Sequence, residues 1–392
     1  MSKKVLVISP VPSHPQDAGN RTRIYNLLRN LQKLGHEVHF LYIQQETKDD
    51  YLMRQAWEEN FYSLPYRQIG DRKRSLAQKI TRKLRCYLTD YPKYPGAVDD
   101  WYENSINHFL VELHRKVNFD VVIVEYVFFS KALNIFGKDV LKIIDTHDVF
   151  ANRTDLYKNN GQEYYWYSTN IKEETKGLRR ADLIIAIQKE EEEYFQKLVG
   201  NKVITVGHTV LLRRPKQMLL PAGNKILYIA SLNETNIHGI KYFINDVLPK
   251  VRAKLPDIQL LIAGKICEAL DKIEGCVKLG YVDNSNEIYD NANVVINPMC
   301  FGTGLKIKSI EALGQSKVLV TTLEGAKGLE AGANKAFLVA KDADEFSQYL
   351  IEVLTNSLLS SNLAKQAYDF AEVYNKKALE PLEKVLDSIP GL

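Results

Sequence analysis

Short apolar runs rich in β-branched residues alternate with amphipathic helical segments along most of this chain, and this alternation limits the fold more than any other feature. Residues 5–10 form the first run, and the segment after it has apolar residues at helical spacing between Ile24 and Leu34. Gly35 follows at the point where that helix is expected to end. Runs that are apolar throughout are typical of parallel strands buried on both faces. The pattern therefore predicts an α/β fold with doubly wound parallel sheets.

The predicted strands fall into two series, which indicates two domains. The first series covers residues 5–10, 38–43, 120–127, 142–149, 182–188 and 203–210, and the second covers residues 225–231, 258–264, 276–282, 293–299 and 317–322. The segment between them, residues 211–224, has two prolines and no clear period, as expected of a linker. We therefore expect a first Rossmann-like domain over residues 1–210, a linker over 211–224 and a second domain over 225–392. The terminal helix is a candidate to pack back on the first domain.

The charge balance and the cysteines argue against several classes of protein. The chain has 52 Lys and Arg against 48 Asp and Glu, whereas a dedicated nucleic-acid-binding protein usually has a larger basic excess. Its apolar runs are too short to cross a membrane, and the first one ends at Pro10, too early for a signal peptide. The four cysteines are Cys86, Cys267, Cys276 and Cys300. Their scattered positions are not metal-ligand spacing and are typical of a reducing compartment, so we expect a cytoplasmic protein.

Residues 51–115 interrupt the alternation with a basic and aromatic segment. Within it, residues 75–88 have Leu76, Ile80, Leu84 and Leu88 on one helical stripe, among lysines and arginines. A basic amphipathic helix can lie on an anionic membrane, which would make the protein peripheral at the inner face of a membrane. We expect instead that the apolar stripe packs on the domain and that the basic face is solvated.

Several motifs for cofactors and metals are absent. A dinucleotide site needs G-x-G-x-x-G, and the nearest match, residues 302–304, has Ile307 in place of the third glycine. No G-x-x-x-x-G-K-[ST] phosphate loop occurs. Residues 342–344, Asp-Ala-Asp, precede a predicted helix and are interpreted as a cap. Residues 145–148 include Asp and His but have no second cluster to complete a metal site. We therefore expect no metal and no cofactor.

The segment FGTGLKIKSIEALG, residues 301–314, is the strongest candidate for a binding site. It follows a predicted strand and opens a predicted helix, and helix entrances bind anions through backbone N–H groups that glycine leaves accessible. Lys306 and Lys308 add charge for a diphosphate. Glu311 lies about 9 Å beyond Leu305 along the helix axis, where a carboxylate can accept two ribose hydroxyl hydrogens. The alternative is a solvated, lysine-rich helix start with Glu311 in a surface ion pair.

Together these residues resemble a known family. The segments at residues 228–251, 260–265, 277–284, 297–322 and 325–329 are similar to the second domain of the family 4 retaining glycosyltransferases. A looser resemblance covers residues 9–23, 143–153 and 177–187. The resemblance implies the GT-B fold, in which two Rossmann-like domains face each other across a cleft. It also implies transfer of a sugar from a nucleotide-sugar with retained anomeric configuration and without a metal.

The resemblance also implies a donor-binding set. Glu311 matches the glutamate that holds the ribose hydroxyls, and the loop Gly302, Thr303, Gly304 and Leu305 matches the cradle for the diphosphate and the sugar. Tyr281 and Val282 match the turn whose backbone meets the base. Gly19 matches a glycine loop of the first domain, and His147 matches a histidine beside the donor sugar. His147, Lys306 and Glu311 are thus the candidate catalytic residues, and the nucleotide-sugar is a substrate, so no cofactor is implied.

Three positions depart from the family pattern. Many members have two glutamates eight residues apart, and Thr303 occupies the first position here. Ser231 stands where the donor site usually has a basic residue, and His238 replaces the lysine before Gly239. The diphosphate therefore lacks two expected cations, and Lys306 and Lys308 are the nearest replacements.

The sequence thus predicts a hexosyltransferase of glycan biosynthesis that uses a UDP- or GDP-linked sugar. The expected acceptor is a glycan, a lipid-linked or a small-molecule substrate, bound by the aromatic and basic residues of the first domain. No nucleic acid is expected as a partner. Two alternatives stay open: a nucleotide-sugar epimerase of the same fold, and a catalytically silent nucleotide-binding protein. Glu125 is a further candidate acid or base, or only the end of a strand.

Overall fold

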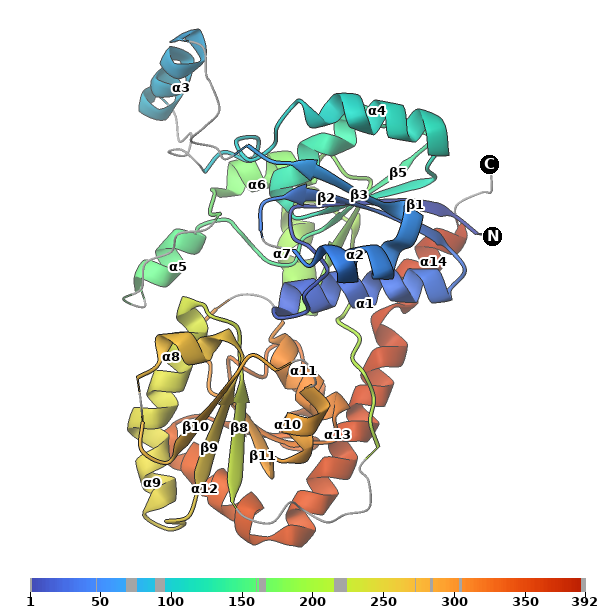
Figure 1. Cartoon of the computed structure of the whole chain (residues 1–392). Coiled ribbons are helices and arrows are strands. Elements are labelled where there is room, and N and C mark those ends of the chain that lie inside the picture. The colour runs from blue at the N-terminus through green and yellow to red at the C-terminus, as the bar shows by residue number, and fades with distance from the viewer. Residues whose placement is uncertain are drawn as a thin grey trace. The chain divides into compact units, whose positions relative to one another are not determined.

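The computed structural model describes residues 2–46, 48–67, 76–88, 96–159, 161, 167–214, 224–271, 273–282, 285–302 and 305–388. Within these residues the chain divides into two compact units. The first unit holds the N-terminal residues to Gln16, Asn20–Val206 and the described residues from Pro381 onward. The second unit holds Gly207–Glu380 together with Asp17–Gly19. Each unit is an α/β body built on one sheet (Figure 1).

The sheet of the first unit has the strand order β3-β2-β1-β4-β5-β6-β7 in the described residues, and its paired strands run parallel. Its strands are β1 (Lys4–Ser9), β2 (Glu37–Gln44), β3 (Phe61–Pro65), β4 (Val121–Glu125), β5 (Leu141–Asp145), β6 (Leu183–Ala186) and β7 (Val203–Thr205). Its helices are α1 (Gly19–Lys33), α2 (Asp50–Trp57), α3 (Leu76–Leu88), α4 (Ile106–Val117), α5 (Arg153–Asn159), α6 (Ile171–Leu178) and α7 (Lys189–Val199). The strand order reverses between β1 and β4.

The sheet of the second unit is also parallel, with the order β10-β9-β8-β11-β12-β13 in the described residues. Its strands are β8 (Lys225–Ile229), β9 (Gln259–Ala263), β10 (Cys276–Gly280), β11 (Val294–Asn297), β12 (Val318–Thr322) and β13 (Leu338–Ala340). Its helices are α8 (Glu234–Tyr242), α9 (Leu248–Arg252), α10 (Ser285–Asp290), α11 (Ile307–Gly314), α12 (Ala343–Thr355) and α13 (Ser357–Ala378). Here the order reverses between β8 and β11. The last helix, α14 (Glu380–Ser388), belongs to the first unit from Pro381 onward.

Apolar side chains from strands and helices form the core of the second unit. Tyr228 and Phe243 are fully buried, and the rings of Phe243 and Phe346 meet edge-on at 5.8 Å. Side-chain caps set where the helices begin: Asn233 accepts from the backbone of α8, and Asp342 accepts from the backbone of α12. Burial of such large side chains contributes about 1.5–3 kcal/mol each, so this apolar face holds α8, α9 and α12 against the sheet.

The alternation predicted every strand of the two series, but it missed two others. β3 and β13, which each lie at an edge of their sheet, were not predicted. The expectation of burial on both faces is wrong for β10, where Val277 and Leu279 are 42% and 38% exposed. β10 is an edge strand with a single neighbour, β9, so part of its surface is left open to solvent.

The predicted helix at residues 75–88 is confirmed as α3, but its expected packing is wrong. Leu76, Ile80, Leu84 and Leu88 are between 52% and 75% exposed. Figure 1 shows α3 standing away from the sheet of its own unit. No helix of the described residues is long and apolar enough to cross a membrane.

Gly239 on α8 provides a test of the packing around the second sheet. An added Cβ would lie 2.9 Å from the backbone oxygen of Pro298 and 3.3 Å from Cα of Met299. Because these atoms are backbone, Gly239→Ala should lower the free energy of unfolding by about 1–3 kcal/mol, although alanine favours a helix. Urea denaturation measures the effect, with the exposed Lys241→Ala on the same helix as the control. A variant as stable as the wild type would contradict the close approach.

Candidate functional site

Residues 301–314 follow the end of a strand and include the start of a helix, as the sequence predicted. β11 ends at Asn297 and α11 begins at Ile307. Gly302 has a φ of +137°, which favours glycine, and Leu305 is buried. Thr303 and Gly304 lie outside the described residues. The segment follows β11, beside the reversal of strand order between β8 and β11, and ligands of α/β sheets bind at such reversals.

Glu311 lies on α11 in a half-buried environment. Its side chain is 32% exposed, and its Oε1 lies 3.9 Å from Nε2 of His208, which is 1% exposed. Burial raises the pKa of the Glu311 carboxyl to about 7, and Lys308 opposes that rise. These surroundings are not those of a solvated surface ion pair. A carboxylate at this place gains from any ligand that donates hydrogen bonds to it.

Lys308 reaches from α11 to the first turn of α8, the helix that follows β8. Its ammonium donates a hydrogen bond to Oδ1 of Asn236 and lies 5.3 Å from the centre of the Tyr228 ring. The amide of Asn236 in turn donates to the backbone oxygen of Ser231 at 2.9 Å. Burial lowers the pKa of Lys308 to about 7, and the nearby charge of Lys306 lowers it further. An anion bound near this ammonium would favour its charged form.

Lys306 has a different neighbourhood. Its Nζ lies 3.0 Å from Oε1 of Glu324, and the two side chains are only 4% and 12% exposed. Lys327 pairs with the other oxygen of Glu324 at 2.9 Å. The charge of Lys306 is therefore largely balanced within the protein, so of the two candidate replacement cations Lys308 has the less compensated charge.

The remaining predicted residues of the second unit follow its strands. Ser231 lies two residues after the end of β8, and its Oγ lies 3.4 Å from the side-chain nitrogens of Asn233 and Asn236. His238 packs edge-on against Phe301 at 5.1 Å, which brings α8 against the loop before α11. Tyr281, 52% exposed, and Val282 follow β10. These positions share the carboxyl edge of the parallel sheet, where the loops of neighbouring strands meet.

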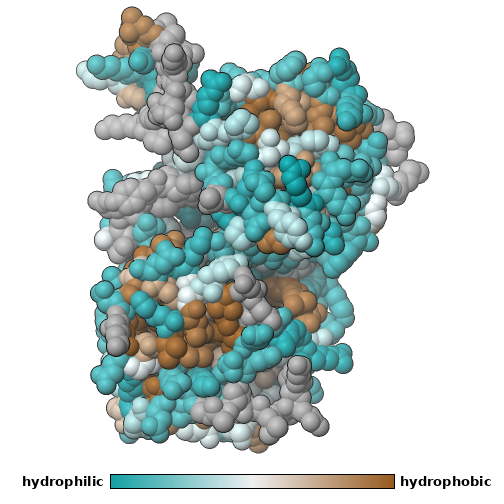
Figure 2. Space-filling view, viewed as in Figure 1, coloured by the Kyte–Doolittle hydropathy of each residue, from teal (hydrophilic) through white to brown (hydrophobic). Residues whose placement is uncertain are grey.

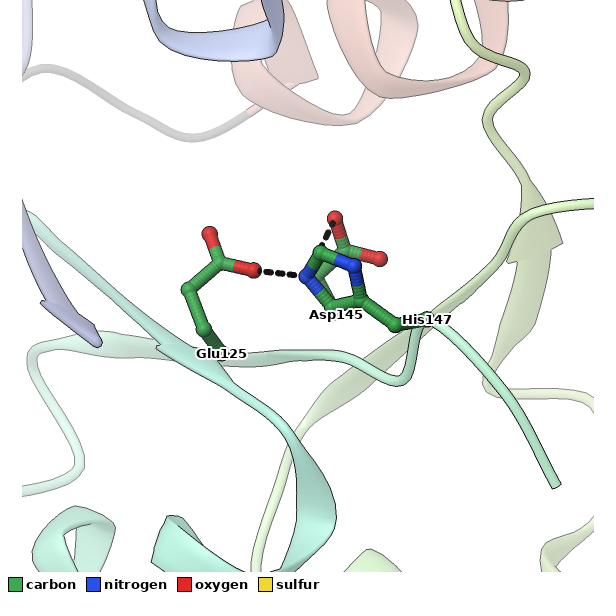
Figure 3. Close-up of side chains that lie close together, drawn as sticks. All are labelled: Glu125, Asp145 and His147. Carbon is green, nitrogen blue, oxygen red and sulfur yellow. Dashed lines mark hydrogen bonds and ion pairs between the residues drawn. The ribbon is translucent and has the colours of Figure 1, made fainter. Parts of the chain in front are cut away.

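In the first unit, three ionisable side chains meet at the carboxyl ends of β4 and β5 (Figure 3). Glu125 and Asp145 are the last residues of these strands and are paired in register. His147 lies two residues beyond β5, and its Nε2 is 2.5 Å from Oε2 of Glu125 and 3.9 Å from Oδ2 of Asp145. Both carboxylates are fully buried. Burial and the charge of Asp145 raise the pKa of Glu125, although the His147 and Arg23 interactions oppose the rise.

Helix α1 supplies further support for this group. Arg23, 1% exposed, pairs with Oδ1 of Asp145 at 2.9 Å. Asn20 donates to the hydroxyl of Tyr126 at 2.9 Å, and the Tyr126 ring stacks on His147 with centres 4.3 Å apart. Gly19 is the first residue of α1. The prediction placed His147 here but did not find Arg23 or Asn20. The basic run RTR and the asparagine before it were the available signals.

Glu125, Asp145 and His147 form the type of group that can hold a metal ion, because one ligand atom from each lies within 4.8 Å of the others. Glu125 lies twenty residues before Asp145 in the sequence. The search for metal ligands around residues 145–148 therefore did not include it. The Arg23 guanidinium beside Asp145 opposes a second cation there. Asp148 is not part of this group, because it pairs with Arg153 at 2.5 Å. Asp342 caps α12 as predicted, and Asp344 pairs with Lys250.

Comparison with known proteins adds a family and a fold. Residues 223–356 match the model of the family described as glycosyl transferases group 1. A Klebsiella pneumoniae protein described as an uncharacterized 44.6 kDa protein in cps region is 23% identical over 398 residues, which cover 95% of this chain and 97% of that protein.

Two solved structures have a similar fold. A variant of TarM from S. aureus, solved with fondaparinux, alpha-GlcNAc-glycerol and UDP, is 11% identical with a TM-score of 0.68, covering 99% of this chain and 100% of that chain. The sucrose-phosphate synthase of Thermosynechococcus elongatus is 13% identical with the same TM-score of 0.68 and the same coverage, 99% and 100%. The GT-B fold is thereby confirmed, and so is the resemblance to glycosyltransferases. Membership of family 4 and retention of configuration stay predictions.

The raised pKa of Glu311 predicts a pH-dependent stability. The folded pKa of about 7 exceeds the ordinary value of 4.5, so the folded state binds more protons between these values and loses stability as the pH rises through them. Glu311→Gln should therefore gain stability relative to the wild type between pH 5 and pH 8, by about 1 kcal/mol after allowance for solvent screening. Urea denaturation at several pH values measures the difference. Glu268→Gln, at an exposed position, is the control, and a difference independent of pH would contradict the burial argument.

Proposed function

We propose that this chain, whose residues 223–356 match the family described as glycosyl transferases group 1, moves a hexose from a nucleoside-diphosphate sugar to an acceptor. The reaction retains the anomeric configuration and needs no metal. The observation that carries the proposal is the arrangement on α11, where the start of the helix, Lys308 and Glu311 follow one another beside the reversal of strand order. Along this helix an anion site comes first and a carboxylate that can accept hydroxyl hydrogens comes second. A nucleoside diphosphate has the matching order, with its diphosphate next to its ribose.

The donor site has three parts in this proposal. Backbone N–H groups of the loop before α11 and the ammonium of Lys308 bind the diphosphate. Glu311 accepts the ribose hydroxyls, and Tyr281 and Val282 meet the base. Ser231 and His238 occupy positions where the family usually has basic residues, and Lys308 provides the positive charge in their place. The hydrogen bond from Lys308 to Asn236 places the ammonium near the Ser231 turn. UDP is the first nucleotide to test, because the TarM variant was solved with UDP.

In this proposal, catalysis depends on stabilising the negative charge of the diphosphate, which is the leaving group. Cleavage of the bond between sugar and diphosphate increases the negative charge on the diphosphate in the transition state. Preorganised donors and a nearby ammonium stabilise that charge more than they stabilise the bound substrate. His147, two residues beyond β5, and Gly19, the first residue of α1, stay the residues that the family resemblance implies beside the transferred sugar.

The first prediction of the proposal separates phosphate binding from nucleoside binding. Lys308→Met keeps an unbranched side chain against Tyr228 and removes the charge. Because hydrogen bonds to charged groups contribute about 1.5–3 kcal/mol, the variant should bind UDP roughly 10- to 100-fold more weakly and uridine nearly as well as the wild type. Glu311→Gln should weaken the binding of both ligands, because both contain the ribose. Calorimetry in buffer with EDTA measures both and tests metal independence.

Lys241→Met, an exposed position on α8, is the matched control and should bind UDP as the wild type does. Equal losses of UDP and uridine in Lys308→Met would contradict a role for Lys308 at the diphosphate. Binding that requires added metal would contradict metal independence. An isomer formed from a nucleotide-sugar alone would favour the epimerase, and a wild-type protein that binds no nucleotide at all would favour the silent protein.

The exposed helix α3 supports a peripheral contact with an anionic membrane, where a lipid-linked acceptor would lie. Its apolar stripe is Leu76, Ile80, Leu84 and Leu88, and Tyr87 is 87% exposed. The helix contains no acidic residue, and Lys79 and Lys83 are exposed beside the stripe. Figure 2 shows hydrophobic side chains at the surface over α3. A basic helix with an open apolar face has the composition of an interfacial helix.

One basic residue of α3 has a structural role. Arg82 pairs with Asp100 at 2.7 Å, and both side chains are largely buried. A test of membrane binding must leave this pair intact, because its loss would detach the helix from the domain rather than remove a lipid contact.

The prediction is that the wild-type protein sediments with vesicles that contain phosphatidylglycerol and not with pure phosphatidylcholine vesicles. Each basic residue near an anionic surface contributes about 1 kcal/mol, so Lys79→Gln/Lys83→Gln should weaken binding roughly 30-fold at low salt. Lys241→Gln/Lys254→Gln, at exposed positions of the second unit, is the control. A wild-type protein that ignores both vesicles would rule out the membrane contact without bearing on UDP binding.

A further inference from the structure

The carboxylate of Glu324 lies between two lysines in the second unit. Its Oε1 is 3.0 Å from Nζ of Lys306, and its Oε2 is 2.9 Å from Nζ of Lys327. The side chains of Lys306 and Glu324 are 4% and 12% exposed, whereas that of Lys327 is 40% exposed. Oε1 of Glu324 makes no hydrogen bond within the described residues. Charge, rather than a directed bond, therefore joins this carboxylate to Lys306.

Lys306 stands at the start of the helix that carries the candidate donor site. It is the residue directly before α11, and its Cε would lie 3.7 Å from a Cβ added at Gly302, so its stem passes along the loop before the helix. Its charge also reaches Lys308, where it helps to lower the pKa. A lysine ammonium is a point charge on a flexible stem. The ammonium of Lys306 can therefore pair with Glu324 or with an anion at the start of α11.

Polar contacts of the turn after β12 fix the position of Glu324. The side chain of Thr322 accepts from the backbone N–H of Gly325 at 3.0 Å, and the hydroxyl of Ser309, on α11, donates to the backbone oxygen of Gly325 at 2.8 Å. A Cβ at Gly325 would lie 2.9 Å from the backbone oxygen of Asn297, so glycine allows this close approach. The turn is therefore held against α11, together with the carboxylate that it carries.

We propose that Glu324 competes with the diphosphate for the ammonium of Lys306, and that it thereby limits how tightly the site at the start of α11 binds its ligand. This inference rests on the proposed function, in which a nucleoside diphosphate binds at this helix start. A diphosphate carries more negative charge than one carboxylate, so it can take the ammonium, but its binding must first weaken the pair of Lys306 and Glu324. The ligand class is an anion with a diphosphate group.

A purely structural role of the ion pair is the alternative. Desolvation of a buried ion pair offsets much of its attraction, so such a pair adds little stability to the fold. A carboxylate at this place also repels an anion that binds beside it. Lys327 remains as a cation for Glu324 when Lys306 turns to a ligand. These points favour competition for Lys306 over a structural role.

Calorimetry of the full chain with UDP, inorganic pyrophosphate and uridine tests the competition. Glu324→Gln removes the charge and keeps the shape of the side chain. It should bind UDP and pyrophosphate roughly 10-fold more tightly than the wild type does, because each gains a hydrogen bond from a charged group, and it should bind uridine equally well. In the Lys306→Met background the same substitution should bring no gain. Glu330→Gln, at an exposed position in the segment that follows, is the matched control and should leave all three affinities unchanged.

Unchanged or weaker binding of UDP and pyrophosphate by Glu324→Gln would overturn the competition in favour of a structural pair. A gain that persists with Lys306→Met would also overturn it, because repulsion alone would then explain the effect. If Glu324→Gln does not fold, Glu324→Asp, which draws the carboxylate back by one methylene, should still give a smaller gain for pyrophosphate, and no gain would overturn the inference. Tighter pyrophosphate binding in a chain that binds no UDP contradicts the proposed function and leaves the competition standing. A chain that binds neither anion, with or without Glu324, would overturn both.

Discussion

Parallel pairing of strands is the constraint on which both halves of this protein depend. Parallel strands end at the same edge of a sheet, so residues that follow different strands are brought together there. In the first unit the register pairs Glu125 with Asp145 and sets His147 between their carboxylates. In the second unit the neighbouring strands β8 and β11 bring the Ser231 turn close to α11. The same backbone geometry thus builds both groups of polar residues.

Burial of charge gives these groups their chemical character. Lys308 and Glu311 both have pKa values of about 7, because each charged form is poorly solvated where it lies. A bound diphosphate and ribose would supply the charge and the hydrogen-bond donors that the protein leaves out. The charge of Lys306, by contrast, is balanced within the protein by Glu324. Lys306 has a carboxylate partner, whereas Lys308 bonds to the neutral amide of Asn236. For this reason Lys308, and not Lys306, is proposed to bind the diphosphate.

The sequence reached some residues of the candidate site and not others, for a physical reason. Glu311, Lys306, Lys308 and His147 stand in local patterns, a helix start and a strand end, that can be recognised along the chain. Arg23, Asn236 and His208 act through contacts across the fold, and no spacing predicts such contacts. Local pattern also failed at α3, because periodicity identifies an apolar stripe but does not show whether another surface covers it.

The amino-acid sequence by itself determined the class of fold, since alternation of apolar strands with amphipathic helices leaves few other ways to bury the apolar faces. It also predicted a strand end followed by a helix start around residues 301–314, which the structure has, with Glu311 on that helix. Only the tertiary structure decided that Glu324 balances the charge of Lys306, that Glu125 and Asp145 meet His147, and that α3 exposes its apolar stripe. These properties depend on burial and on neighbours distant in sequence, which a linear pattern does not contain.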